Sequence, residues 1–189
     1  MRLFVAVNLP AEERRRAWAA AAPLRARHWP VRWVAEDALH LTLRFLGEVE
    51  PERVEAIQEA LRGAVRAARP FTVSLGGLGA FPSLGKPRVV WVGIEHHPAL
   101  ELLANDVELA LMGLAFEPEL RPFNPHLTIG RAEKSARPAS FKDFAGLAAE
   151  FAYSGTTTVE TVDLMQSTLG PQGASYTVLA RAPLGGGAA

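Results

Sequence analysis

One four-residue pattern, histidine–aliphatic–threonine–aliphatic, occurs twice in this 189-residue chain. It reads His40-Leu41-Thr42-Leu43 in the first half and His126-Leu127-Thr128-Ile129 in the second, 86 residues further on. An aromatic residue follows each copy at nearly the same distance, Trp91 51 residues after the first histidine and Tyr176 50 residues after the second. A duplication of this length predicts two similar lobes related by a pseudo-two-fold axis.

Strands and helices are expected to alternate along both halves. Alternating or short apolar runs predict strands, at residues 2–8, 39–45, 71–75, 88–94, 126–130, 151–157, 159–168 and 175–181. Apolar residues at helical spacing, most often after a proline, predict helices, at residues 10–22, 50–69, 97–114 and 140–149. The glycine- and proline-rich stretch 76–87 is expected to be a loop, and its glycines lack the spacings of nucleotide-binding loops.

These elements predict an α+β fold. The later strands of each half follow one another without long helical crossovers, so the sheets should be largely antiparallel. We therefore expect a bilobal pseudo-two-fold body of two similar α/β lobes, with largely antiparallel sheets flanking a central groove. Residues 1–184 are expected to form this single domain, and residues 185–189 a frayed tail.

Composition excludes several classes of function. Basic and acidic residues balance at 20 each, which argues against a protein that binds long tracts of nucleic acid or an anionic membrane. With no cysteine, the chain cannot form disulfides, thiolate zinc sites, iron–sulfur clusters or a cysteine nucleophile. No apolar run reaches the length of a membrane span, and the first residues lack a secretory signal, so the expected compartment is the cytoplasm.

The two tetrads carry groups suited to acid–base chemistry on a phosphate. Alternate residues of a strand share a face, so His40 lies beside Thr42, and His126 beside Thr128. Two histidines on opposite sides of a phosphorus could deprotonate the attacking oxygen and protonate the leaving oxygen. Threonine hydroxyls could donate hydrogen bonds to the phosphate oxygens. A strained cyclic phosphodiester fits this set as a substrate.

Other interpretations of the histidines are weaker. A single histidine on a half-buried strand is more often a packing residue than a catalyst, but two matching copies favour function. Neither tetrad supplies a carboxylate or a third nitrogen ligand, so a zinc site is not favoured and no metal or cofactor is expected. His28, His96 and His97 are expected to be solvated.

The chain resembles the 2H phosphoesterase superfamily, and within it the RNA 2′,3′-cyclic phosphodiesterase branch, also called 2′-5′ RNA ligase. The motifs that carry the resemblance are MRLFVAV at the start, HLTLRFLGEV, FNPHLTIGR, and Tyr176 followed by Pro183-Leu184. The similarity runs from about residue 1 to residue 184.

The resemblance implies metal-free hydrolysis of a 2′,3′-cyclic phosphate at an RNA end, such as that of a tRNA fragment, to a 2′-phosphate. His40 would be the proton donor to the departing 3′ oxygen, and His126 the proton acceptor that activates water. Thr42 and Thr128 would hold the phosphate oxygens. With a 5′-hydroxyl in place of water, the same chemistry would make a 2′,5′ linkage. No protein partner or membrane is implied, and a monomer is expected.

Two arginines and three aromatic residues are further candidates. Arg44 is in phase with His40 if its strand stays regular, although a solvated position at the strand end is equally consistent with the pattern. Arg131 closes the family pattern and should contact substrate, but strict alternation puts it on the wrong face. Its strand must therefore end or bulge at Gly130. Candidates for stacking on a terminal base are Trp33, Phe45 and Phe81, each of which also fits a core position.

Three other functions remain open at this stage. The same chemistry could act on a small cyclic nucleotide, in which case mononucleotides would serve as well as oligonucleotides. A non-catalytic RNA- or nucleotide-binding module would keep the groove without turnover. A metal-dependent phosphodiesterase would lose activity in the presence of a chelator.

Overall fold

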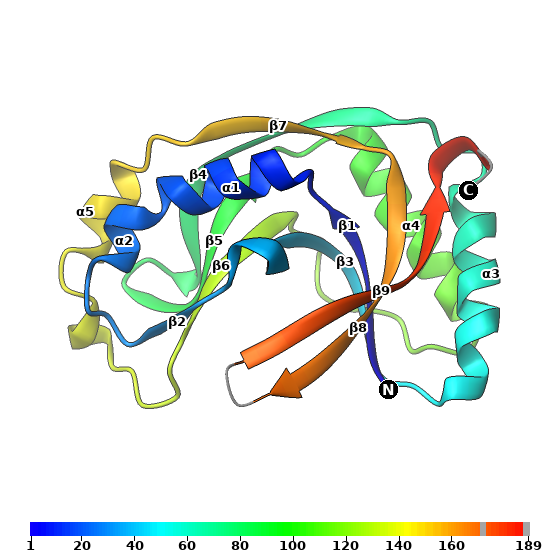
Figure 1. Cartoon of the computed structure of the whole chain (residues 1–189), viewed down its shortest axis with the longest axis horizontal. Helices are drawn as coiled ribbons and strands as arrows, with labels where there is room; N and C mark the ends of the chain where they lie inside the picture. Colours follow the sequence, from blue (N-terminus) through cyan, green and yellow to red (C-terminus); the bar gives the residue numbers. More distant parts are fainter. Residues whose placement is uncertain (171–172, 187–189) are drawn as a thin grey trace.

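The computed structural model describes residues 1–170 and 173–186 and contains a single continuous sheet with helices packed against it (Figure 1). The strands are β1 (Arg2–Asn8), β2 (Val31–Trp33), β3 (His40–Glu48), β4 (Phe71–Ser83), β5 (Lys86–Ile94), β6 (His126–Ala132), β7 (Ser154–Val159), β8 (Thr161–Gly170) and β9 (Gly173–Pro183). The α-helices are α1 (Ala11–Ala20), α2 (Ala22–Arg25), α3 (Val54–Val65), α4 (Pro98–Met112) and α5 (Phe144–Ala149).

The order of the strands has a two-fold pattern about its centre. Across the described residues the order is β7-β4-β5-β6-β3-β1-β8-β9, and the short β2 pairs with β6. Neighbouring strands are antiparallel throughout, which confirms the expected α+β class with an antiparallel sheet. The two halves join where β3 meets β6, with Leu41 opposite Leu127.

The register of the strands repeats in the two halves, including its irregularity. Each half has a residue inserted at the matching place, Leu43 in β3 and Ile129 in β6, and β3 has a second one at Leu46. The matched pairs are Phe4–Phe45, Val5–Arg44, Ala6–Thr42, Val7–Leu41 and Asn8–His40 in one half, and Val89–Arg131, Val90–Gly130, Trp91–Thr128, Val92–Leu127 and Gly93–His126 in the other. The pseudo-two-fold relation predicted from the tetrads is therefore present at the level of single residues.

The strands are exchanged between the two halves of the sheet. After β3 the chain crosses to β4 and β5, which lie beside β6, and after β6 it returns to β8 and β9, which lie beyond β1. As a result, Trp91 packs near His126, with ring centres 6.2 Å apart, and Tyr176 packs near His40, at 5.0 Å. The aromatic residue that follows each histidine in sequence therefore contacts the other histidine.

Several element boundaries differ from the prediction. The expected loop 76–87 is mostly strand, because β4 continues to Ser83 and β5 begins at Lys86. Its glycines have a packing role: the indole of Trp91 lies over Gly79, where a Cβ atom would be 2.1 Å from the ring. The helix expected over residues 10–22 is divided into α1 and α2, and Pro23 stands in the first turn of α2, where a backbone N–H has no partner within the helix and its absence costs nothing. The three-residue β2 was not predicted.

The core lies between the sheet and the helices. In Figure 1, α3 and α4 lie side by side at one end of the molecule, and α2 and α5 lie at the other. Leu41 and Leu127 are 1% and 0% exposed, so the face of β3 and β6 that carries them is buried and the opposite face carries the histidines. Burial of such apolar surface is the main force that stabilises a domain of this size.

Two further observations concern the ends of the chain and the membrane. Leu184–Gly186 form a 3₁₀ turn, whereas residues 187–189 of the expected tail lie outside the described residues. Within the part of the chain that the structure describes, no helix is long and apolar enough to cross a membrane.

Replacement of Gly79 by alanine should destabilise the protein. The new methyl group would force the Trp91 indole out of its position, and overpacking of this kind costs about 1–3 kcal/mol in the free energy of unfolding. Gly63→Ala in α3 is the control, because no atom lies within 4 Å of its added Cβ, and it should stabilise by about 0.5–1 kcal/mol. Urea unfolding measures both, and equal stability of G79A and wild type would contradict this packing.

Candidate active site

The two tetrads lie side by side on one face of the sheet. Because Leu41 is opposite Leu127 in an antiparallel pair, His40 lies across from Thr128 and Thr42 across from His126. The charge of His126 acts on His40, so the two imidazoles are near each other. We call the face that carries these four residues the site face. The structure therefore brings together the four residues that the sequence singled out.

Both imidazoles are held in the same way by the main chain. The Nδ1 atom of His40 is 2.8 Å from the carbonyl oxygen of Ala38, and that of His126 is 2.7 Å from the carbonyl oxygen of Asn124. A carbonyl oxygen only accepts hydrogen bonds, so each Nδ1 carries a proton and donates it. Each Nε2 atom is therefore the one left to take or give a proton in a reaction.

Aromatic rings pack against each histidine. The His40 ring lies 4.8 Å from the ring of Phe4 and 5.0 Å from that of Tyr176. The His126 ring lies 5.1 Å from that of Phe81, in addition to its contact with Trp91. These contacts restrict the rotation of both imidazoles and remove water from their surroundings.

A β-bulge returns Arg131 to the site face. Ile129 is the extra residue opposite β5, and both Ile129 and Gly130 are buried, so the alternation of β6 shifts by one position before Arg131. The predicted bulge is thereby confirmed, one residue wide at Ile129–Gly130. The positive charge of Arg131 acts on both histidines.

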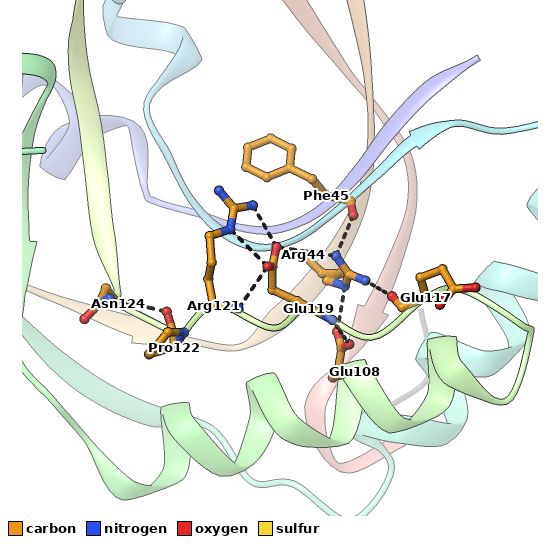
Figure 2. Close-up of polar contacts among 8 residues, drawn as sticks. All are labelled: Arg44, Phe45, Glu108, Glu117, Glu119, Arg121, Pro122 and Asn124. Carbon is orange, nitrogen blue, oxygen red and sulfur yellow. Dashed lines mark hydrogen bonds and ion pairs between the residues drawn. The ribbon is translucent and has the colours of Figure 1, made fainter. Parts of the chain in front are cut away.

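Arg44 lies elsewhere, and the reason is the matching bulge in β3. Leu43 is the extra residue there, so Arg44 leaves the face of His40, and its side chain turns toward α4. Its Nε atom is 2.6 Å from Glu108 Oε2 and its Nη1 atom 3.7 Å from Glu119 Oε2, as Figure 2 shows. The placement of Arg44 beside substrate, which assumed a regular strand, is not what the structure shows.

Phe45 takes the place that a regular strand would have given to Arg44. It is the equivalent of Arg131 in the repeated register, it is 54% exposed, and its ring lies 6.0 Å from that of Phe4. Of the other stacking candidates, Phe81 contacts His126, whereas Trp33 packs over Gly130. The site face is therefore asymmetric, with an arginine on one side and an exposed phenylalanine on the other.

The segment before His126 is anchored by the Arg44 contacts. Glu108 accepts a hydrogen bond from the backbone N–H of Glu119 at 2.7 Å, and Arg44 donates to the carbonyl oxygen of Glu117. Figure 2 shows that this segment continues through Arg121 to Asn124, whose carbonyl holds His126. Arg44 thus connects the segment before β6 to β3 and α4.

Burial lowers the pKa of both histidines. For His40 the loss of hydration is the largest cause; the hydrogen bond to Ala38 opposes it, and the charges of Arg131 and His126 add to it. For His126 burial is again the first cause, opposed by the hydrogen bond to Asn124 and reinforced by Arg131. The neutral imidazole is therefore favoured at both positions relative to free histidine.

The other chemical groups were less visible in the sequence. The carbonyl oxygens of Ala38 and Asn124 exist at every residue, so no sequence signal marks them. Within residues 1–170 and 173–186, no group of three histidine, aspartate or glutamate side chains is arranged to hold a metal ion. His96 is exposed and contacts Glu101, and His97 caps α4 through its side chain.

The candidate site therefore consists of two histidine–threonine pairs on the adjacent strands β3 and β6. The family model described as "2′-5′ RNA ligase superfamily" matches residues 13–171. The chain therefore belongs to the 2′-5′ RNA ligase superfamily, which confirms the resemblance found in the sequence.

Individual relatives agree with this assignment. A Thermotoga maritima protein named RNA 2′,3′-cyclic phosphodiesterase is 33% identical over 99% of this chain and 97% of its own length. One of the same name from Geobacillus stearothermophilus is 39% identical over 56% of this chain, which spans 34% of that protein. A crystal structure of a Thermus thermophilus protein superposes with a TM-score of 0.76, at 31% identity and 98% coverage of both chains. Escherichia coli LigT complexed with 3′-AMP gives 0.71, at 32% identity and 97% coverage of both chains.

Replacement of Arg44 by alanine should destabilise the fold more than loss of a surface ion pair. The side chain is 13% exposed, and its removal leaves Glu108 without its cation, whereas Glu119 keeps its pair with Arg121. Arg44 also donates hydrogen bonds to the carbonyl oxygens of Phe45 and Glu117. Hydrogen bonds to a charged group contribute about 1.5–3 kcal/mol, so a loss of this size is expected. Arg62→Ala breaks the exposed pair with Glu59 and should cost about 0.5 kcal/mol or less. Thermal unfolding measures the stability of both variants. An equal loss of stability in the two would contradict the anchoring role of Arg44.

Proposed function

We propose that this protein hydrolyses the 2′,3′-cyclic phosphate at an RNA end to a 2′-phosphomonoester, without metal, by acid–base catalysis between His40 and His126. The observation that carries the proposal is the placement of two histidines and two threonines on adjacent strands, each imidazole presenting Nε2 while Nδ1 donates to a carbonyl. The names of the relatives identify the same substrate class for those proteins.

The reaction assigns one proton transfer to each histidine. His126 Nε2 removes a proton from water as the water oxygen bonds to phosphorus. The bond from phosphorus to the 3′ oxygen breaks, and His40 Nε2 delivers its proton to that oxygen. The products are a 2′-phosphomonoester and a 3′-hydroxyl, and exchange with solvent restores the protons of the two imidazoles. With a 5′-hydroxyl in place of water, the same steps form a 2′,5′ linkage, and reversal of those steps breaks it.

The neighbouring groups fit these roles. Arg131 lies on the site face and would bind the phosphate oxygens, together with the hydroxyls of Thr42 and Thr128. The exposed ring of Phe45 is available for stacking on a base. One chain carries both histidines, which supports a monomer acting on a single RNA end; the cytoplasm stays the compartment predicted from the sequence.

Loss of either histidine should abolish turnover. Acid–base catalysis contributes about 10²–10⁴-fold for each transfer, so His40→Ala and His126→Ala should each lower the rate by that factor. The assay is a short RNA with a 2′,3′-cyclic phosphate end in excess EDTA, with the position of the product phosphate determined. His96→Ala is the matched control, because that side chain is exposed and lies outside the site, and it should keep full activity.

Other outcomes of the same assay separate the remaining functions. Equal turnover of mononucleotides and oligonucleotides would favour a small cyclic nucleotide as substrate. Binding of RNA with no turnover of any cyclic phosphate would identify a binding module. Loss of activity in EDTA would indicate a metal-dependent reaction.

The pH profile should report the coupled histidines. His126 must be neutral and His40 protonated, so kcat/KM rises through one apparent pKa and falls through another. Because burial and Arg131 lower the pKa of both imidazoles, the optimum should lie below pH 6.5, near which a free histidine titrates.

Arg131→Gln tests the electrostatic part of this profile. Removal of the charge that lowers both pKa values should move both limbs to higher pH, in addition to weakening substrate binding. Arg62→Gln, on α3, removes a distant charge and should leave the limbs in place. A rate that rises steadily from about pH 5 to 9 would contradict the assignment of acid and base.

A further inference from the structure

The two sides of the site face differ at positions that the repeat makes equivalent. Trp91 in β5 corresponds to Ala6 in β1. On the His126 side the indole of Trp91 fills the space over Gly79. On the His40 side the equivalent residue, Ala6, is buried against Met165 and Tyr176. A cavity of about 410 Å³, lined in part by the same Met165 and Tyr176, lies beside His40.

The size and walls of this cavity suit a small organic ligand. Ligand sites have volumes of about 300–1,000 Å³ and combine apolar surface with a few convergent polar groups. Here Met165, Tyr176 and Val178 supply the apolar surface. The polar groups come from β1, the segment before His40, β8 and β9, and include Asn8, Asp37, Asp163 and Arg181.

Asp163 is the polar group that points most directly to a ligand. It is 1% exposed, and its Oδ2 atom accepts a hydrogen bond of 2.7 Å from Asn8 Nδ2 and lies 3.7 Å from Arg181 Nε. Its Oδ1 atom is buried and has no hydrogen-bond partner among the described residues. A buried acceptor without a donor is unfavourable, so a ligand donor that reaches Oδ1 from the cavity would be strongly bound.

The charges of the cavity select the type of ligand. Three carboxylates line it, those of Asp37, Glu160 and Asp163, against the guanidinium groups of Arg14 and Arg181. An excess of acceptors repels a phosphate and favours a neutral group rich in N–H donors. The phosphate itself would lie beyond His40, toward His126 and Arg131, so a nucleoside attached to it can place its base in the cavity.

We propose, resting on the function proposed above, that this cavity receives the base of the terminal nucleotide and prefers guanine to uracil. Guanine presents a ring N–H and an adjacent amino group on its pairing edge, whereas uracil presents one N–H between two carbonyl oxygens. A carboxylate accepts from the first pair of groups and repels the carbonyl oxygens of the second. Asp163 is the residue assigned to this discrimination.

The test compares kcat/KM for the 2′,3′-cyclic monophosphates of guanosine, adenosine, cytidine and uridine, together with methyl riboside 2′,3′-cyclic phosphate, which has no base. A site built for hydrogen bonds rejects a ligand that cannot make them, so guanosine should exceed uridine by about tenfold or more. Asp163→Asn turns an acceptor into a donor and should reduce this ratio to about threefold or less. Asp106→Asn on α4, outside the cavity, should leave the ratio unchanged.

A second variant keeps the test decisive if Asp163→Asn does not fold. Val178→Trp fills the cavity from a side chain that is 36% exposed, and should lower kcat/KM for the four nucleosides while sparing the substrate without a base. Equal kcat/KM for guanosine and uridine in the wild type, or equal losses on all five substrates in Val178→Trp, would overturn the inference. Absence of wild-type turnover on every substrate, RNA included, would instead refute the function itself.

Discussion

Leu41 and Leu127 meet across the antiparallel contact of β3 and β6, and both side chains are buried. Because neighbouring residues of a strand point to opposite faces, burial of these two leucines places His40 and His126 on the other face. A slip of the register by one residue would bury the imidazoles and expose the leucines. The hydrophobic core therefore fixes the position of the two histidines, and the hydrogen bonds from Nδ1 then fix the orientation of each ring.

The sequence was sufficient for the features that depend on period and repetition. The strand at residues 2–8 and the strand starts at the two tetrads follow from alternation, and the pseudo-two-fold relation follows from the repeated tetrad. The exchange of strands between the halves could not be predicted from the sequence. The spacing from each histidine to the next aromatic residue, Trp91 or Tyr176, is the same whether that residue packs against its own histidine or against the other one. The glycines of β4 were misinterpreted because a glycine that accommodates an indole and a glycine in a loop look alike in a sequence.

The two matching β-bulges also limited what the sequence could predict, because each one decides on which face of the sheet an arginine lies. The family pattern placed Arg131 beside the substrate, whereas strict alternation placed it on the opposite face, so a bulge could be inferred. No such conflict arose at Arg44, and the equivalent bulge at Leu43 was not predicted. As a result, Arg44 was predicted on the site face, where the structure has Phe45 instead. Glu108 and Glu119, which hold Arg44, come from α4 and the segment after it, and their proximity depends on tertiary packing alone.

Departures from symmetry give direction to a nearly symmetric site. Two identical half-sites would bind a phosphate equally well in either orientation, and each histidine would serve equally as acid or base. Arg131, the equivalent of Phe45, places positive charge on the His126 side, where the Trp91 indole also packs over Gly79, and the cavity lies on the His40 side. With the base of the substrate in this cavity, as proposed above, the leaving 3′ oxygen would lie near His40 and water near His126. This asymmetry supports the proposed roles of His40 as acid and His126 as base, which the two tetrads by themselves leave undetermined.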